Sequence, residues 1–298
     1  MENLTILLIG VVDMFYKMIE AKRDKWINSP DCPVKELLRY MLNTGKLRDA
    51  QIEAIKTYLF LKIACNNKPL YQLFAEGKFN MTDVEQLEDL PLSTSTRKYL
   101  QKHPEAVALY DFVSLEKGDD EIISKKAKEL IEKNPEAISD YRDIFKRFFY
   151  GVEYSDYIFS LPMGAGKTYL MAIFIYLDLY YAKLEPNNKA FAHNFIIFAP
   201  SGLKSSVVPS LKTIENFDPS WIIPEPAATE IKRLLKFEVL DAVKSEKKSN
   251  KTKNPNVQKI AINQPLSELF GFIAVCNAEK VILDKVKIDN KTKTVIEL

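Results

Sequence analysis

The sequence predicts an α/β protein in which a long helical region precedes a mostly parallel β-sheet. Up to about residue 150, apolar positions recur with the period of a helix, as in 37–42. Uninterrupted apolar runs rich in β-formers then appear at 157–161, 195–199 and 270–276, separated by helical patterns, as in a parallel sheet covered on both faces. Only nine of the 298 residues are glycine, about 3% where roughly 7% is usual, which also favours helix.

The composition excludes several classes of protein. A hydrophobic fraction of 47% is enough for a real core and excludes wholesale disorder. The net charge is only +2, so contact with nucleic acid would need a local basic patch. Three dispersed cysteines and two histidines form no disulfide framework or zinc motif, which predicts a reducing, cytoplasmic location. The apolar run 4–12 is too short to span a bilayer, so we expect a buried first helix and no membrane association.

The helical region is punctuated by proline and glycine, and it contains one internal echo. The segment 103–106 (His-Pro-Glu-Ala) recurs at 134–137 as Asn-Pro-Glu-Ala. One interpretation is a helical repeat of the solenoid type. The other, which we favour, is two helix starts built alike, each with a polar cap, proline at the first helical position and glutamate near the positive helix end.

Three segments of the second half complete the predicted elements. A long apolar helix is expected over 169–181. The lysine-rich stretch 244–259 is expected to be a surface loop, with a phosphate-binding patch as the alternative. Residues 281–298 predict two strands joined at 289–290. The chain stops in mid-strand, so we expect it to be a piece of a longer protein.

Between the first apolar run and the apolar helix lies a phosphate-loop pattern, Leu-Pro-Met-Gly-Ala-Gly-Lys-Thr at 161–168. Gly164 and Gly166 would let backbone N–H groups turn around a β-phosphate without a Cβ in the way. Lys167 would neutralise the β- and γ-oxygens, and Thr168 would offer a hydroxyl to Mg²⁺. The helix that follows points its positive end at the same anion. The sequence therefore predicts a nucleotide site, with a chance Gly-x-Gly-Lys-Thr in a loop as the alternative.

The first glycine of the general phosphate-loop pattern is replaced by Leu161. A loop of this form resembles motif I of the DEAD/DEAH-box helicase superfamily. Upstream, 47–55 (Leu-Arg-Asp-Ala-Gln-Ile-Glu-Ala-Ile) resembles the segment of that superfamily whose glutamine reads adenine. The amide of Gln51 can pair with both N6 and N7 of adenine, although alone this residue would be interpreted as part of a solvated helix face. The resemblance implies that ATP and Mg²⁺ are held by Gln51, Gly164, Ala165, Gly166, Lys167 and Thr168, with Lys167 also catalytic and Thr168 on the metal.

The strand-and-loop segment 195–207 (Phe-Ile-Ile-Phe-Ala-Pro-Ser-Gly-Leu-Lys-Ser-Ser-Val) resembles motif Ia of the same superfamily, which touches the nucleic-acid backbone. The resemblance implies phosphate contacts from Ser201, Lys204 and Ser205; the alternative is an ordinary β-to-α turn with a serine cap. This segment most resembles the motor subunit of type III restriction enzymes. That likeness implies double-stranded DNA as the polymer and a methyltransferase or specificity subunit as a protein partner.

Two departures from the family pattern affect this interpretation. About 110 positions separate Gln51 from Leu161, where the family has a few tens, so a helical insertion is implied. The Asp-Glu-x-His motif is absent: an apolar run ends in Asp284, but Lys285 follows it, so we interpret Asp284 as a hairpin residue. A missing motif and an abrupt end are both expected of an amino-terminal fragment.

These expectations define a domain layout. Residues 1–150 would form a helical domain that carries the glutamine segment (45–60) and a helical insertion (66–150). Residues 151–298 would form the first RecA-like ATP-binding lobe, truncated before the Asp-Glu-x-His motif. The resemblance implies part of a helicase-like, ATP-dependent DNA translocase. The rival expectation is a nucleotide-sensing regulator or scaffold that acts on a protein partner, and a small-molecule kinase is disfavoured because no arginine-rich lid is found.

Overall fold

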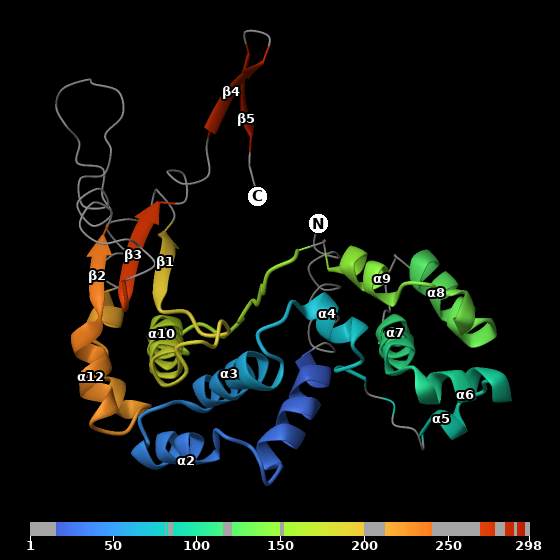
Figure 1. The fold of residues 1–298 in the computed structure, drawn as a ribbon, viewed down its shortest axis with the longest axis horizontal. Coiled ribbons are helices and arrows are strands. Elements are labelled where there is room, and N and C mark those ends of the chain that lie inside the picture. The colour runs from blue at the N-terminus through green and yellow to red at the C-terminus, as the bar shows by residue number, and fades with distance from the viewer. Residues whose placement is uncertain are drawn as a thin grey trace. The chain divides into compact units, whose positions relative to one another are not determined.

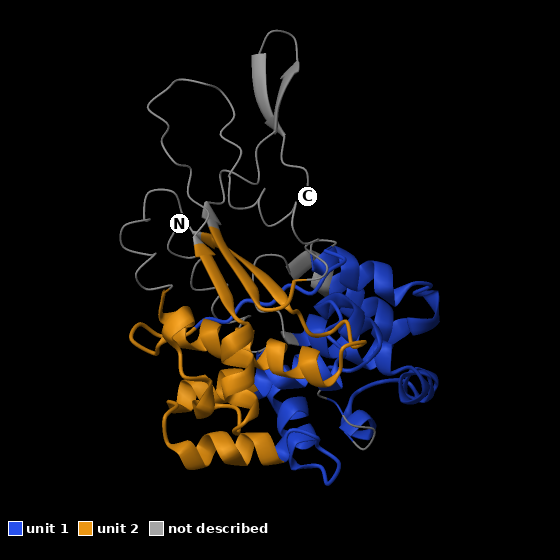
Figure 2. Cartoon of the chain, turned by 60° about the vertical axis from the view of Figure 1, so that its left-hand side comes forward, with its two compact units in different colours: residues 1–35, 56–160 blue, residues 36–55, 161–298 orange. Residues whose placement is uncertain are grey.

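In the computed structural model, the described residues are 16–80, 82, 86–115, 121–149, 152–199, 212–239, 269–277, 284–288 and 291–295. The chain divides into two compact units, coloured separately in Figure 2. We call residues 1–35 with 56–160 the helical unit, and residues 36–55 with 161–298 the sheet unit. The glutamine segment up to residue 55 therefore groups with the phosphate loop, although most of the helical region lies between them in sequence.

The helical unit confirms that the described residues before about 150 are mainly helical (Figure 1). Residues 16–28 form one of its helices. The others are the end of α3 (Asp49–Leu59), the π-helical η1 (Phe60–Ala64), α4 (Leu70–Ala75), α5 (Gln86–Asp89), α6 (Thr94–Lys102), α7 (Pro104–Leu115), α8 (Glu121–Lys133), the 3₁₀ turn η2 (Pro135–Ala137) and α9 (Tyr141–Phe148).

Aromatic side chains form the centre of the helical unit. Phe74 of α4 is almost fully buried and lies 5.2 Å from Phe79, 5.8 Å from Phe112 of α7 and 5.6 Å from Phe145 of α9, measured between ring centroids. The Phe79 and Phe112 contacts are edge-to-face, and this geometry adds attraction to the large apolar area that the rings bury. The helical unit therefore has a core of its own.

The internal echo marks two helix starts of different length. The first copy opens α7, in which Pro104 is the first residue of a 12-residue helix. The second opens only the three-residue turn η2, and α9 begins separately with Asp140, whose side chain accepts a hydrogen bond from the N–H of Asp143 at 3.0 Å. The first copy is a helix start, as expected, whereas the second opens only a turn and Asn134 makes no side-chain cap there. The two copies therefore form neither equal repeats nor two helix starts built alike.

The sheet unit contains a three-stranded parallel sheet in the order β1–β3–β2, as Figure 1 shows. The strands are β1 (Asn194–Ala199), β2 (Lys236–Val239) and β3 (Phe272–Asn277). In the register, Phe195 lies opposite Ile273, and Phe237 lies opposite the same residue from the other side. The prediction of parallel strands at 195–199 and 270–276 is confirmed.

Helices of the sheet unit begin with α2 (Lys35–Thr44) and the first part of α3, and continue with α10 (Lys167–Leu184), η4 (Pro219–Trp221) and α12 (Ala227–Leu234). Residues 212–216 are also helical. The helix expected over 169–181 is thus confirmed as α10. Most buried side chains of α10 are apolar or aromatic, including Ile173, Tyr176 and Leu177. This packing fixes the helix whose N-terminus follows the phosphate loop.

The strand predicted at 157–161 is wrong, because these residues form extended chain with no strand partner among the described residues. Tyr157 donates its hydroxyl to the carbonyl of Lys68 at 2.7 Å, and the ring of Phe159 lies 6.2 Å from that of Tyr58. Ile158, between them, is 92% exposed. Alternate side chains therefore pack onto the helical unit, which satisfies the apolar pattern without a sheet. Coverage of both sheet faces is also not found at β1, where Ile196 and Phe198 are exposed.

Residues near the C-terminus confirm the predicted hairpin. Strands β4 (Asp284–Ile288) and β5 (Lys291–Val295) pair antiparallel, and Asp284 lies opposite Val295. Asp284 is therefore a hairpin residue, as expected. The expected first helix (4–12) and the lysine-rich loop (244–259) lie outside the described residues. Across the described part of the chain, none of the helices has the length and apolar character needed to cross a bilayer.

Candidate nucleotide site

Two glycines shape the phosphate loop. Gly164 and Gly166 have φ values of +79° and +80°, the left-handed region that residues with a Cβ rarely adopt. At Gly166 space is also restricted, because an added Cβ would lie 2.7 Å from Nε2 of Gln51; at Gly164 no atom lies within 4 Å. Ala165 between them is buried, and its N–H donates to the carbonyl of Pro162 at 3.3 Å. Glycine at 164 and 166 therefore suits the left-handed backbone conformation that this loop adopts.

The loop runs directly into the N-terminus of α10, with Gly166 as the N-cap. The first intrahelical hydrogen bond is donated by Leu170 to the carbonyl of Gly166 at 3.0 Å. The N–H groups of the three residues before Leu170 therefore have no acceptor within the helix and point toward its positive end. Lys167, which is exposed, and Thr168, which is partly buried, lie in this first turn. Such a helix start attracts phosphate and carboxylate groups.

The glutamine segment contacts the carbonyl groups of the phosphate loop. Nε2 of Gln51 donates to the carbonyl oxygen of Gly166 at 3.2 Å, and the guanidinium of Arg48 donates to that of Gly164. Oε1 of Gln51 accepts the backbone N–H of Arg48 at 3.0 Å, which caps the start of α3. The structure thus brings together two segments that the sequence keeps far apart.

The surroundings of Gln51 limit what it can offer to a base. Its side chain is 5% exposed, so the alternative of a solvated helix face is wrong. A primary amide has two donor and two acceptor positions, and the hydrogen bonds to Gly166 and Arg48 use one of each. One N–H and one lone pair therefore remain, which is the number that bidentate pairing with adenine requires.

An aromatic cluster of Tyr169, Phe217 and Trp221 lies in the same unit. It was not predicted from the sequence. The ring of Tyr169, two residues after Lys167, stacks on that of Trp221 at 5.8 Å with an interplanar angle of 2°. Phe217 approaches the Tyr169 ring edge-on at 6.3 Å. The hydroxyl of Tyr40 donates to the carbonyl of Ser220 at 2.6 Å, which ties η4 to α2. No periodicity or motif links these positions, so sequence reasoning had no signal for the cluster.

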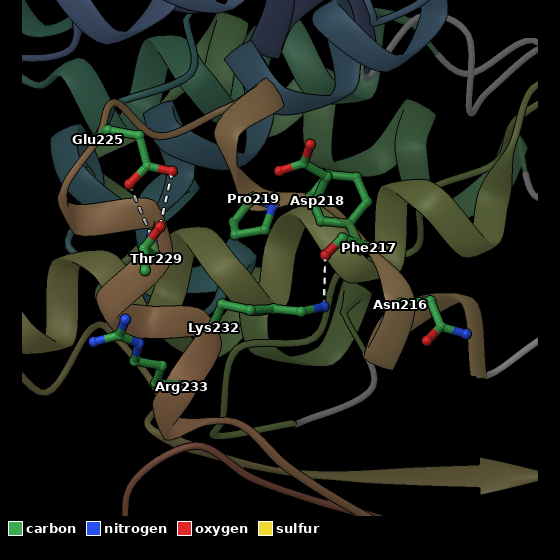
Figure 3. Close-up of a pocket in the computed structure, with 8 residues that line it drawn as sticks. All are labelled: Asn216, Phe217, Asp218, Pro219, Glu225, Thr229, Lys232 and Arg233. Atoms are coloured by element: carbon green, nitrogen blue, oxygen red, sulfur yellow. Dashed lines mark hydrogen bonds between the residues drawn. The ribbon is translucent and has the colours of Figure 1, made fainter.

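A groove of about 420 Å³ lies elsewhere in the sheet unit (Figure 3). It is lined by Asn216, Phe217, Asp218, Pro219, Glu225, Thr229, Lys232 and Arg233. Some of its polar groups already have hydrogen-bond partners. Lys232 donates to the carbonyls of Phe217, at 2.7 Å, and Glu215, and burial lowers the pKa of the Lys232 ammonium group. The Glu225 carboxylate accepts from the N–H and hydroxyl of Thr229 at 3.2 and 3.0 Å. No phosphate-loop residue lines the groove, so we assign it no part in nucleotide binding.

The remaining predicted residues are not placed. Ser201, Lys204 and Ser205, expected to contact DNA, lie outside the described residues. Among those that are described, no three His, Cys, Asp or Glu side chains gather in a way that could hold a metal ion. At the loop itself, Thr168 in the first turn of α10 carries a hydroxyl, a group that can coordinate Mg²⁺. Comparisons of the chain with protein-family models, curated proteins and solved structures gave no match.

Proposed function

We propose that the sheet unit binds ATP with Mg²⁺ at the loop 164–168. One observation carries this proposal: two glycines in the left-handed conformation lead straight into the N-terminus of a buried helix whose first turn carries Lys167 and Thr168. This combination supplies backbone N–H groups, a cation and a hydroxyl at one place, which is the donor set that a Mg-triphosphate requires.

Each residue of the loop has a defined task in this proposal. Lys167 neutralises oxygens of the β- and γ-phosphates, and Thr168 offers its hydroxyl to the metal. A bound Mg²⁺ would neutralise further phosphate charge and fix the position of the phosphate oxygens. Gln51 would pair with adenine through its remaining N–H and lone pair.

For the whole protein we propose a helicase-like, ATP-dependent DNA translocase of a restriction-type or related DNA-processing system. The support is the resemblance of three segments to one superfamily, together with the contact between two of them, the glutamine segment and the phosphate loop. Because the Asp-Glu-x-His motif is absent from this sequence, we expect this chain alone to hydrolyse ATP far more slowly than about 1 s⁻¹, the low end of usual enzyme turnover.

The first experiment measures nucleotide binding. Calorimetric titration with Mg-ATP should give saturable binding, and Lys167→Ala should weaken it at least about tenfold. Lys189→Ala, which removes another exposed lysine of the same unit, serves as the matched control and should bind like the wild type. Equal affinities for the wild type and Lys167→Ala would overturn the proposed nucleotide site.

The second experiment tests the motor. Duplex DNA should stimulate ATP hydrolysis by the protein that contains the complete motor region, and Lys167→Ala should abolish the stimulated rate. The rival function, a nucleotide-sensing regulator, is favoured by the helical unit, whose separate aromatic core around Phe74 suits a scaffold for a protein partner. Nucleotide binding that depends on Lys167, with no stimulation by any DNA or RNA, would favour the regulator over the translocase.

A further inference from the structure

We infer that Arg48 is a positioning residue that holds the phosphate loop in its anion-binding conformation before nucleotide arrives. The inference rests on the proposed function, since it concerns how the same loop is prepared for phosphate. It assigns to Arg48 a role that is separate from the reading of adenine and from direct contact with the phosphates.

The geometry of an anion-binding loop favours such a residue. When successive N–H groups of a loop converge on an anion, the carbonyl groups of that loop point outward. Gly164 and Arg48 are both exposed, so water can also pair with the Gly164 carbonyl, and a fixed side-chain donor acts by selecting one orientation of that carbonyl. In this chain the carbonyl oxygens of Gly164 and Gly166 accept from the side chains of Arg48 and Gln51.

The two donors form one unit of structure. Arg48 immediately precedes α3, and Gln51 lies in its first turn, where its side chain accepts the backbone N–H of Arg48 at 3.0 Å. Both side chains are thus presented from one helix start. They donate hydrogen bonds to the carbonyls of Gly164 and Gly166, which are separated by the single residue Ala165.

The two ends of the loop differ in how they are held. The carbonyl of Gly166 accepts from both Gln51 and the α10 residue Leu170, so α10 itself fixes that end. Gly164 lies outside the helix, and a Cβ added to it would have no atom of the surrounding structure within 4 Å. The guanidinium contact at Gly164 therefore matters more for the conformation of the loop than the amide contact at Gly166. Arginine suits this position because its planar fork carries five N–H donors.

The test separates positioning from direct phosphate contact. In the nucleotide-free protein, Arg48→Ala should raise hydrogen exchange of the loop amides in 161–168 severalfold, and Arg48→Lys should restore part of the protection. Arg39→Ala, which removes an exposed arginine paired with Glu36 in the same unit, is the control and should leave the loop unchanged. Far-ultraviolet circular dichroism and the thermal midpoint confirm that each variant is folded.

Ligands without a base complete the test. Arg48→Ala should lower affinity for Mg-tripolyphosphate and Mg-ATP by the same factor, about tenfold, since the loop and not the base is affected. Unchanged exchange with weaker binding would mean direct phosphate contact and would overturn the inference, as would no change in either quantity. In both cases a loss of binding in Lys167→Ala would leave the proposed function intact. Wild-type binding that does not depend on Lys167 would instead refute the proposed function itself.

Discussion

The amide nitrogen of Gln51 donates to the carbonyl oxygen of Gly166 at 3.2 Å, across 115 positions of sequence. The same carbonyl accepts the first intrahelical hydrogen bond of α10, from Leu170 at 3.0 Å. Both acceptor positions of the oxygen are therefore used, and the N-terminus of α10 is joined to the start of α3. The close approach of the Gln51 amide also explains why a glycine is needed at 166.

A methyl group added at Gly166, where the Gln51 amide comes close, should disrupt the loop. Gly166→Ala places a Cβ 2.7 Å from Nε2 of Gln51 on a residue with φ of +80°, so we expect weaker Mg-ATP binding and a loss of about 1–3 kcal/mol in the free energy of unfolding. Gly164→Ala has the same backbone strain but no close neighbour and should cost less. Adding Gln51→Ala to Gly166→Ala should recover part of the loss in a double-mutant cycle. Strict additivity would contradict the steric explanation.

The hydroxyl of Tyr176 should be dispensable. It is buried within α10 and has no hydrogen-bond partner among the described residues, so Tyr176→Phe should leave the free energy of unfolding unchanged or raise it by up to about 1 kcal/mol. The contrasting variant is Tyr141→Phe, because the Tyr141 hydroxyl donates to the carbonyl of Pro135 at 3.2 Å and its removal should cost about 1 kcal/mol. Denaturant unfolding measures both, and a marked loss in Tyr176→Phe would show that the hydroxyl has a partner after all.

Alkaline pH should destabilise the helical unit through Cys65. Burial raises the pKa of this thiol from 9.0 to about 12. Folding therefore favours the neutral thiol, and its contribution to stability is complete below about pH 9 and is lost as the pH rises toward 12. Unfolding measured between pH 8 and 11 should show a steeper loss for the wild type than for Cys65→Ala. Identical slopes would mean that Cys65 titrates normally in the folded protein.

Truncation of Phe74 should have the largest effect on stability. Its ring contacts those of Phe79, Phe112 and Phe145 at 5.2–5.8 Å and is nearly inaccessible to solvent. Phe74→Ala should lower the free energy of unfolding by about 3–5 kcal/mol, the usual cost of a large buried cavity. Tyr154→Ala, at an exposed aromatic of the same unit, should change it by less than about 0.5 kcal/mol. A small loss at Phe74 would indicate that α4 and α9 do not share a fixed core.

The sequence predicted correctly those elements that local periodicity and turn residues define by themselves. The apolar length of α10, the strands at 195–199 and 270–276 and the hairpin at 284–295 all follow from local periodicity and turn residues. It failed at 157–161, because an apolar run does not reveal whether a sheet or a helical unit will bury it. It missed β2, since Lys-Phe-Glu-Val is short and only half apolar.

In the candidate site too, local patterns could be predicted from the sequence and tertiary contacts could not. The glycine pattern with Lys167 and Thr168 was readable because phosphate chemistry dictates both residue types and spacing. Gln51 was found only through a family resemblance, and its hydrogen bond to Gly166 is a tertiary contact that no local pattern encodes. The contact of the Arg48 guanidinium with the Gly164 carbonyl was not predicted, because a polar residue that bonds to a backbone carbonyl has no characteristic spacing.

The stacking of Tyr169 on Trp221 gives the protein an intrinsic optical probe. The chain has only two tryptophans, and the other, Trp26, lies in the helical unit, 5.7 Å from Phe60. In a Trp26→Phe background all indole emission would come from Trp221. Because its stacking partner follows Thr168 directly, a ligand that shifts the first turn of α10 would alter the quantum yield. Occupancy of the loop could then be followed by stopped-flow fluorescence, without any label on the nucleotide.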